Sequence, residues 1–467
     1  MTHLHIIGIC GTAMAGLAIM AKEQGLQVTG SDSGIYPPMS TLLEALGIPL
    51  HEGFAPENLQ PRPDLVLVGN AISRGNPELE AVLEMGIPYR SGAQWLFEHV
   101  LEGRHPVVAS GTHGKTTTTS LLACIWEEAG LQPGFLIGGI PLNFGQGARL
   151  PRKEWVMVEG DEYDTAFFDK RPKFLHYRPR TLILNNLEFD HADIYADLEA
   201  IRRQFRLLLR SVPASGHLIA NGDDPEIVQL VAGSFSRVVP YGIHSQQPFM
   251  ARLESGDGRH WTLLREGQPL FSVQWQQVGE HNVTNGLAAA TAALVNGIPP
   301  ERVKAGLEAF QGVARRLQLR FERNQIAVYD DFAHHPTAIA TTLAGVRAAI
   351  GSARLWVVLE PRSNTMRTRV HQERLAPAFA TADRVILARP QARGLAVEEM
   401  LDVEAVVAQL NQRDQPGALP TAMVVASARE AVTLLGRHCT PGDHIVIMSN
   451  GGFDGIHQKL QEELSAL

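Results

Sequence analysis

Cysteine, excess positive charge and long apolar runs are all scarce in this chain of 467 residues. The three cysteines, Cys10, Cys124 and Cys439, lie far apart and form no CxxC pair. Their number and spacing exclude a disulfide framework and a cysteine zinc site, and are typical of the reducing cytosol. No apolar run is long enough to cross a bilayer, and the N-terminus lacks the basic and apolar segments of a signal peptide. We therefore expect a cytoplasmic protein with no membrane partner.

Lys and Arg total 41 against 49 Asp and Glu, which gives a net charge of −8. This balance argues against a general nucleic-acid surface, so an anionic ligand has to be held by glycine loops and a few placed cations. The GxSxG element of serine hydrolases and the protein-kinase signatures are also missing. A hydrophobic content of 45% indicates a globular protein, and the length predicts two or three domains.

The stretch from Pro106 to Gly130 predicts a nucleotide site. A short apolar run, a glycine-punctuated turn and a helix from Thr116 onward follow one another, which is the context of a phosphate-binding P-loop. Lys115 would reach the β- and γ-phosphates, and Thr116 would complete a Mg²⁺ shell. A plain polar turn is the alternative, but the flanking strand and helix favour the phosphate site. The predicted phosphate-binding residues are Gly111, Thr112, His113, Gly114, Lys115, Thr116 and Thr117.

The N-terminal residues resemble a dinucleotide-binding βαβ unit, with Gly8 and Gly11 in the first turn and Asp32 after the second strand. Cys10 stands where the second glycine would be, which argues against ordinary NAD binding. The loop and the following helix could still hold the diphosphate of another nucleotide. Cys10 is either a thiol with a lowered pKa or, as we favour, a small packed residue.

Polar residues follow several predicted strands, at the ends where open α/β sheets bind ligands. Asn70 follows the strand over residues 64–69, and Glu159 follows the strand over residues 155–158 beside the P-loop, as a Mg²⁺ ligand does. His191 follows a later strand and is a second metal ligand, a substrate contact or a solvated surface histidine. Three α/β domains are expected, over residues 1–100, 101–312 and 313–467.

In chain order, these motifs resemble the Mur ligase family of peptidoglycan enzymes over the whole length. The matching segments are GTHGKTT at 111–117, EGDE at 159–162, NLEFDH at 186–191, HNVTN at 281–285, Arg315-Arg316 and DDFAHHP at 330–336. The resemblance implies an ATP-dependent carbon–nitrogen ligase that uses ATP and Mg²⁺. It also implies an N-terminal Rossmann-like UDP-sugar-binding domain, a central P-loop ATPase-like domain and a C-terminal Rossmann-like acceptor-binding domain.

Segments such as SDSGIYPPMSTLLE and LEPRSNTM are similar to one branch of the family. That branch joins UDP-N-acetylmuramate to the recycled tripeptide L-alanyl-γ-D-glutamyl-meso-diaminopimelate, through an acyl phosphate. The alternative within the family is the ligase that adds a single L-alanine. From other classes, an NAD-dependent oxidoreductase and a non-catalytic nucleotide switch remain open. We expect the two substrates as partners, and a monomer or weak dimer.

The resemblance also implies residue roles. Lys115 would hold the β/γ-phosphates, with Thr116 and Glu159 on a first Mg²⁺ and His191 on a second. Roles at the nucleotide are also implied for Asn282 and Asn285 (adenine), Asp330 or Asp331 (ribose), Arg316 or Arg315 (phosphates) and His335 or His334 (adenosine side, or structural). The UDP-sugar is expected at Gly8, Cys10, Gly11, Thr12, Ala13, Met14, Asp32 and Asn70. Arg362 and Arg367 would clamp an acceptor carboxylate. The stretch over residues 199–205 has no lysine, so we expect no carbamylated lysine.

Overall fold

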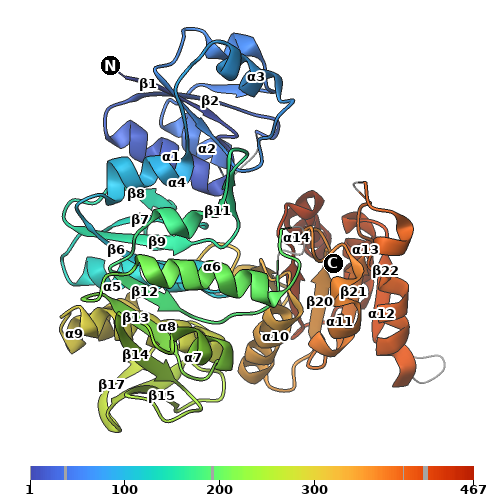
Figure 1. The fold of residues 1–467 in the computed structure, drawn as a ribbon. Coiled ribbons are helices and arrows are strands. Elements are labelled where there is room, and N and C mark those ends of the chain that lie inside the picture. The colour runs from blue at the N-terminus through green and yellow to red at the C-terminus, as the bar shows by residue number, and fades with distance from the viewer. Residues whose placement is uncertain (1, 36–38, 191–193, 393, 414–418, 467) are drawn as a thin grey trace.

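The computed structural model describes residues 2–35, 39–190, 194–392, 394–413 and 419–466. These ranges form three α/β domains, with the N-terminal domain stacked on the central one and the C-terminal domain beside it (Figure 1). The predicted fold class is confirmed. Each predicted segment contributes one main sheet, although the residue limits of the domains stay predictions. None of the helices in these ranges combines the length and apolarity that a bilayer span needs.

The N-terminal domain is a five-stranded parallel sheet in the order β3-β2-β1-β4-β5. Its helix α1 packs on the central sheet. A Cβ at Gly16 would lie 2.5 Å from Leu136 Cδ1, so glycine permits the close approach. The strands are β1 His3–Ile7, β2 Gln27–Asp32, β3 Leu50–Glu52, β4 Leu65–Val68 and β5 Tyr89–Ser91, and the helices are α1 Thr12–Glu23, α2 Met39–Ala45, α3 Pro77–Glu84 and α4 Gly92–Leu96.

A buried polar cluster holds α3 to this sheet. Glu78 accepts hydrogen bonds from His5 Nε2 at 2.6 Å, Ser31 Oγ at 2.8 Å and Asn58 Nδ2 at 2.8 Å. Burial by itself would raise the pKa of Glu78, but these three partners outweigh it and lower the pKa. The pair of His5 and Glu78 is fully buried, so its charge and hydrogen bonds have no solvent to replace them.

Replacing Glu78 by alanine is expected to destabilise the protein by about 3–5 kcal/mol, because buried partners lose their acceptor. Since the pKa is lowered on folding, the carboxylate stabilises the fold above pH 4.5 and this contribution is lost as the pH falls further. Urea unfolding at pH 7 and pH 4 would measure both effects. Glu80→Ala, which removes an exposed ion pair with Arg74, should change little. Equal losses in the two variants would contradict this account.

The central domain is built on a ten-stranded sheet in the order β17-β16-β15-β14-β13-β12-β6-β9-β7-β8. The inner strands β13, β12, β6 and β9 are parallel, so their carboxyl ends meet at one edge. The bounds are β6 His105–Ser110, β7 Gly134–Leu136, β8 Ala148–Arg149, β9 Trp155–Gly160, β12 Thr181–Leu184, β13 His217–Asn221, β14 Arg237–Gly242, β15 Phe249–Leu253, β16 His260–Arg265 and β17 Gln268–Gln274. The helices are α5 Lys115–Glu128, α6 Leu198–Ser211, α7 Pro225–Val231, α8 Glu280–Val295 and α9 Pro300–Ala309.

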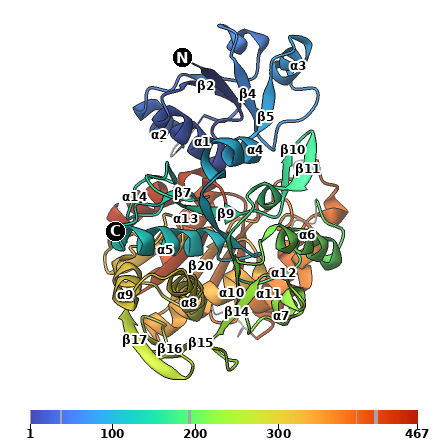
Figure 2. The ribbon, with the colours of Figure 1, turned by 60° about the vertical axis from the view of Figure 1, so that its left-hand side comes forward.

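A hairpin of β10 (Asp164–Ala166) and β11 (Asp169–Pro172) leaves the central domain and reaches the N-terminal sheet (Figure 2). Its tip carries Phe167 and Phe168, whose rings lie 6.1 Å and 5.1 Å from the ring of Tyr89 in β5. The hairpin therefore ties the first two domains together next to the site described below.

The C-terminal domain has a six-stranded sheet in the order β18-β19-β23-β20-β21-β22, parallel except for β18. It meets the central domain where α10 crosses the start of α8. A Cβ at Gly345 would lie 2.8 Å from Gly279 Cα, so two glycines permit the contact. The bounds are β18 Gln318–Arg323, β19 Ile326–Asp331, β20 Leu355–Leu359, β21 Arg384–Ala388, β22 Ala422–Val425, β23 His444–Met448, α10 Pro336–Ile350, α11 Gln372–Ala378, α12 Val403–Leu410, α13 Ala428–His438 and α14 Ile456–Ala466.

Candidate active site

A cavity of about 970 Å³ lies where the three domains meet, at the carboxyl edge of the central sheet. All three domains contribute lining residues. The predicted site residues that line it are Gly11, Thr12, Ala13, Met14, Asn70, Thr112, His113, Gly114, Lys115, Thr116, Thr117, Glu159, Asn282, Asn285, Arg316, Asp331, His334 and His335, whereas Gly111 does not line it. The structure thus brings together predicted residues from positions 11 to 335.

The P-loop runs from the end of β6 to the start of α5, as predicted, although the helix begins one residue earlier, at Lys115. Gly114 has φ of +81° and a Cβ there would lie 2.3 Å from Asn285 Oδ1. A Cβ at Gly111 would lie 3.0 Å from the backbone nitrogen and oxygen of Asn186. Both glycines are therefore required by conformation and by close packing, and residues 112–117 of the loop line the cavity.

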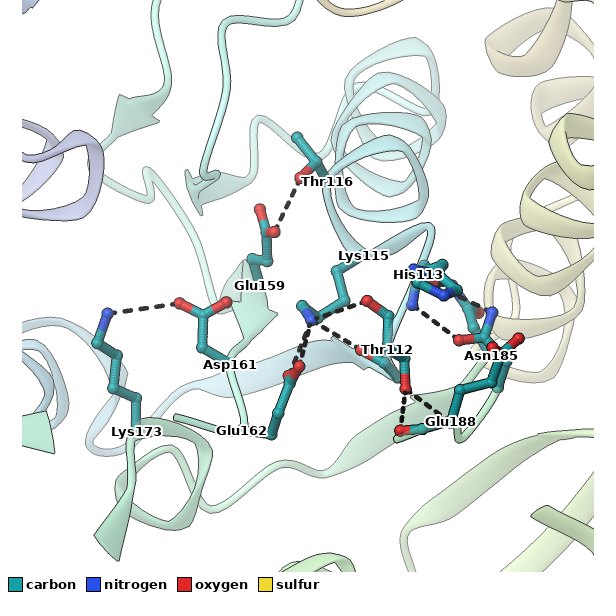
Figure 3. A network of polar contacts seen from close by, with 12 residues as sticks. Thr112, His113, Lys115, Thr116, Glu159, Asp161, Glu162, Lys173, Asn185 and Glu188 are labelled. Atoms are coloured by element: carbon teal, nitrogen blue, oxygen red, sulfur yellow. Dashed lines mark hydrogen bonds and ion pairs between the residues drawn. The ribbon is translucent and has the colours of Figure 1, made fainter. Parts of the chain in front are cut away.

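Lys115 is buried, and its ammonium group contacts the loop and a carboxylate (Figure 3). Its Nζ donates to Gly111 O at 2.8 Å, Thr112 O at 3.3 Å and Glu162 Oε2 at 2.8 Å. Burial disfavours the charge, but the nearby carboxylates, Glu162 first, outweigh it and raise the pKa of Lys115. The side chain is therefore a fixed cation at the base of the loop, where a terminal phosphate would sit.

Glu159 and Thr116 form a pair of hard oxygen ligands beside Lys115. Thr116 Oγ1 donates to Glu159 Oε1 at 2.8 Å, and the backbone N–H of Gly138 donates to Glu159 Oε2 at 2.7 Å. Burial, together with Asp161, raises the pKa of Glu159. A half-buried carboxylate beside a hydroxyl suits Mg²⁺, which prefers oxygen ligands.

Asn282 and Asn285 lie on one face of α8, as their spacing predicts. Asn285 Nδ2 donates to Asn282 Oδ1 at 3.5 Å, and Thr118 Oγ1 donates to Asn285 Oδ1 at 3.2 Å. The second asparagine is therefore tied to the P-loop helix, while both line the cavity.

The two adjacent arginines point in different directions. Arg316 donates to Thr116 Oγ1 at 3.2 Å and lines the cavity. Arg315 donates to the carbonyl oxygens of Ser449 at 2.7 Å and Gly451 at 2.6 Å, within its own domain. Of the two residues that the sequence left open, Arg316 is the one that faces the P-loop.

The two aspartates at the end of β19 also face in different directions. Asp330, one of the two residues predicted to contact the ribose, lies beside Arg315 and His457 and does not line the cavity. Asp331 lines it, and accepts from Leu317 N at 2.7 Å and Ala333 N at 2.9 Å. Successive residues of a strand face opposite sides, so only one of the pair faces the cavity, and it is Asp331.

The N-terminal glycine turn lines the cavity only from Gly11 to Met14. Gly8, Cys10 and Asp32 lie behind the lining residues: Asp32 Oδ2 accepts from Cys10 N at 2.9 Å and so holds the turn closed. Burial raises the pKa of Cys10 to about 11, so the lowered-pKa alternative is wrong and the packed thiol is correct. Gly8, at φ of +83°, allows the tight turn. These three residues shape the loop and do not line the cavity.

Family models match all three parts of the chain. They are the Mur ligase family catalytic domain at residues 3–104, the Mur ligase middle domain at 109–293 and the Mur ligase glutamate ligase domain at 315–451. The chain belongs to the Mur ligase family.

Named relatives cover nearly its whole length. The UDP-N-acetylmuramate–L-alanyl-γ-D-glutamyl-meso-2,6-diaminoheptandioate ligase of Escherichia coli (strain K12) is 48% identical over 464 residues, 99% of this chain and 98% of that protein. A UDP-N-acetylmuramate–L-alanine ligase of Agathobacter rectalis is 32% identical over 98% of this chain and 97% of that protein. The crystal structure of a murein peptide ligase from Psychrobacter arcticus 273-4 is 41% identical, covers 100% of this chain and 99% of that chain, and has a TM-score of 0.76.

In this Mur ligase, the two arginines predicted to clamp an acceptor do not share that place. Arg367 is buried and donates to the carbonyl oxygens of Gln391 at 3.2 Å and Ala392 at 3.3 Å, and to Asn364 Oδ1 at 3.1 Å. It therefore holds a loop together and is not placed to clamp a ligand. Arg362 lies against Gly451, where a Cβ would come within 2.0 Å of its guanidinium. Neither side chain lines the cavity, and of the two only Arg362 is left as a candidate.

Three residues in or next to the site were not among the predicted site residues. Glu162 pairs with Lys115, and its place in the EGDE segment was the available signal. Lys173 lines the cavity, 3.5 Å from Asp161 Oδ2 and 4.1 Å from the centre of the Tyr163 ring. His371 packs edge-on to His335 with ring centres 4.6 Å apart, and no motif marked it. His191, predicted as catalytic and as a second metal ligand, lies outside the described residues.

Proposed function

We propose that this Mur ligase joins UDP-N-acetylmuramate to the tripeptide L-alanyl-γ-D-glutamyl-meso-diaminopimelate, at the expense of ATP. The observation that carries the proposal is 48% identity over essentially the whole length to a ligase with that name. The cavity agrees with it, since a P-loop, an oxygen ligand pair and the N-terminal glycine turn open into one space. The family membership sets aside the NAD-dependent oxidoreductase and the non-catalytic switch.

The residues suit a reaction in which two anions must meet. In the first step, a carboxylate oxygen of the muramate attacks the γ-phosphorus of ATP, and ADP leaves. Lys115 precedes Thr116 at the start of α5, and Arg316 donates to Thr116 Oγ1. Both cations would neutralise charge on the phosphoryl group as it transfers. In the second step, the peptide amine attacks the acyl carbon, loses a proton and expels phosphate, which leaves an amide.

We propose that Mg²⁺ is held by Thr116 and Glu159. When bound there, it supplies charge neutralisation for the phosphates. The residues of the chain do the positioning. Gly138 N–H holds Glu159 Oε2 by a hydrogen bond, and Glu162 holds Lys115 by an ion pair. Asn282 and Asn285 line the cavity next to the P-loop, and we place the adenine there. We place the ribose at Asp331 and the UDP-sugar along Gly11 to Met14 and Asn70.

An ADP-release assay with UDP-N-acetylmuramate separates the two acceptor assignments. We expect turnover with the tripeptide and at least tenfold lower kcat/KM with free L-alanine, because a pocket built for a peptide leaves polar groups unpaired when a single amino acid binds. Mass spectrometry of the product confirms the amide. Efficient turnover with L-alanine alone would instead assign the activity of the Agathobacter relative, which is the second candidate because it is 32% identical over nearly the whole chain.

A further inference from the structure

Three histidine rings lie in contact across the boundary between the central and C-terminal domains. His113 in the P-loop and His335 at the start of α10 have ring centres 4.7 Å apart, and His335 and His371 have centres 4.6 Å apart. His335 and His371 are almost fully buried, with 1% and 2% of their surface exposed. Each ring carries two polar nitrogens, so burying three such rings together places several polar atoms away from water.

Half of the six ring nitrogens are buried without a partner. Within the described part of the chain they are Nε2 of His113 and both nitrogens of His371, whereas His335 Nδ1 accepts a hydrogen bond from Thr337 N at 3.3 Å. Buried polar atoms in native proteins are nearly always paired, and exceptions at one place indicate an ion or water that belongs there. The unpaired atoms therefore point to a ligand between the two domains.

A carboxylate completes the arrangement. Glu188 follows β12, and its Oε2 lies 3.8 Å from His335 Nδ1. One ring nitrogen of His113, one of His335 and one carboxylate oxygen of Glu188 all lie within 4.8 Å of one another. Tetrahedral zinc, with bonds of about 2.0–2.1 Å, holds its ligand atoms about 3.3 Å apart, so small side-chain rotations would close the set around an ion.

Other groups orient the carboxylate and add negative charge near the three residues. Thr337 Oγ1 donates to Glu188 Oε2 at 2.8 Å and Arg374 approaches it at 3.4 Å, which orients the carboxylate as outer partners of metal ligands do. Asp190 adds a second negative charge near the rings.

We propose that His113, Glu188 and His335 form a binding site for a divalent transition-metal ion such as Zn²⁺, separate from the Mg²⁺ pair of Thr116 and Glu159. Two imidazoles and one carboxylate suit zinc and its neighbours better than Mg²⁺. Because His113 and Glu188 come from the central domain and His335 from the C-terminal domain, a bound ion holds the C-terminal domain against the P-loop. Excess zinc then slows turnover, which requires the domains to separate for product release.

The test measures metal directly. Full-length protein is freed of metal with a chelator, dialysed against micromolar Zn²⁺ or Co²⁺ without nucleotide, and assayed for metal per chain and for the visible absorption of bound Co²⁺. We expect about one ion per chain with a Co²⁺ spectrum of nitrogen and oxygen ligation. Glu188→Gln and His113→Gln should weaken binding at least tenfold, whereas Glu159→Gln, at the magnesium pair, should keep the spectrum.

Two outcomes would overturn the proposal. The absence of a bound ion and of a Co²⁺ spectrum in the wild type would mean that water satisfies the rings. Binding unchanged in both Glu188→Gln and His113→Gln would put the ion elsewhere. Glu188→Gln is nearly isosteric at a partly exposed position, and circular dichroism of each variant checks that it folds. Zinc inhibition at saturating Mg²⁺ should be relieved in Glu188→Gln.

Discussion

Replacing Lys115 by methionine is expected to lower kcat roughly 10³-fold, the upper end of the loss seen when one preorganised transition-state donor is removed. Lys115 Nζ lies at the base of the loop, held by Gly111 O and by Glu162, and no other ammonium group among the described cavity residues adjoins the P-loop backbone. Single-turnover ADP release at saturating substrates measures the change in the chemical step.

The same substitution also affects stability, which has to be separated from catalysis. Lys115→Met leaves Glu162 buried without its cation and should destabilise the protein by about 3–5 kcal/mol. The double variant Lys115→Met/Glu162→Gln removes both charges, so its melting temperature should recover toward the wild type while its kcat stays low. A double variant that regains both would mean that Lys115 acts only through stability.

The parts of the site that lie on one element could be predicted from the sequence. The P-loop was found because its strand, glycines and helix are consecutive, and Gly114 and Lys115 lie where the motif puts them. Asn282 and Asn285 were found because one helical turn separates them. In each case, backbone geometry over a few residues decides where a side chain points, and the sequence contains that geometry.

Choices between adjacent residues could not be predicted in the same way. In each of two adjacent pairs, one residue faces the cavity and the other faces away from it. Arg316 and Asp331 face the cavity, while Arg315 and Asp330 do not, and this choice depends on how the domains pack. The contacts of Arg367 could not be predicted, because nothing local shows that the carbonyls of Gln391 and Ala392 fold back to accept from it. His371 comes from a segment without a motif and joins the site only through tertiary contact.

The second large effect on kcat is expected for Arg316, which faces the P-loop, and not for its neighbour Arg315. Arg316→Gln should lower kcat by roughly 10²–10³-fold, because the planar cation beside Thr116 is the only guanidinium among the described cavity-lining residues. Burial lowers the pKa of Arg316, but an arginine remains charged in proteins. Steady-state kcat with saturating ATP, UDP-N-acetylmuramate and tripeptide measures the loss.

Arg315→Gln is the matched control, since it removes the same side chain one residue earlier. Its guanidinium bonds to the carbonyl oxygens of Ser449 and Gly451, so the variant should melt at a lower temperature while kcat falls less than tenfold. If Arg315→Gln lost as much kcat as Arg316→Gln, the C-terminal loop geometry would be limiting and the direct role of Arg316 would be wrong. The opposite pattern, with kcat lost only in Arg316→Gln, would mean that the C-terminal domain delivers one cation to the transferring phosphoryl group. It would also mean that its neighbour holds the loop over residues 449–451 in place.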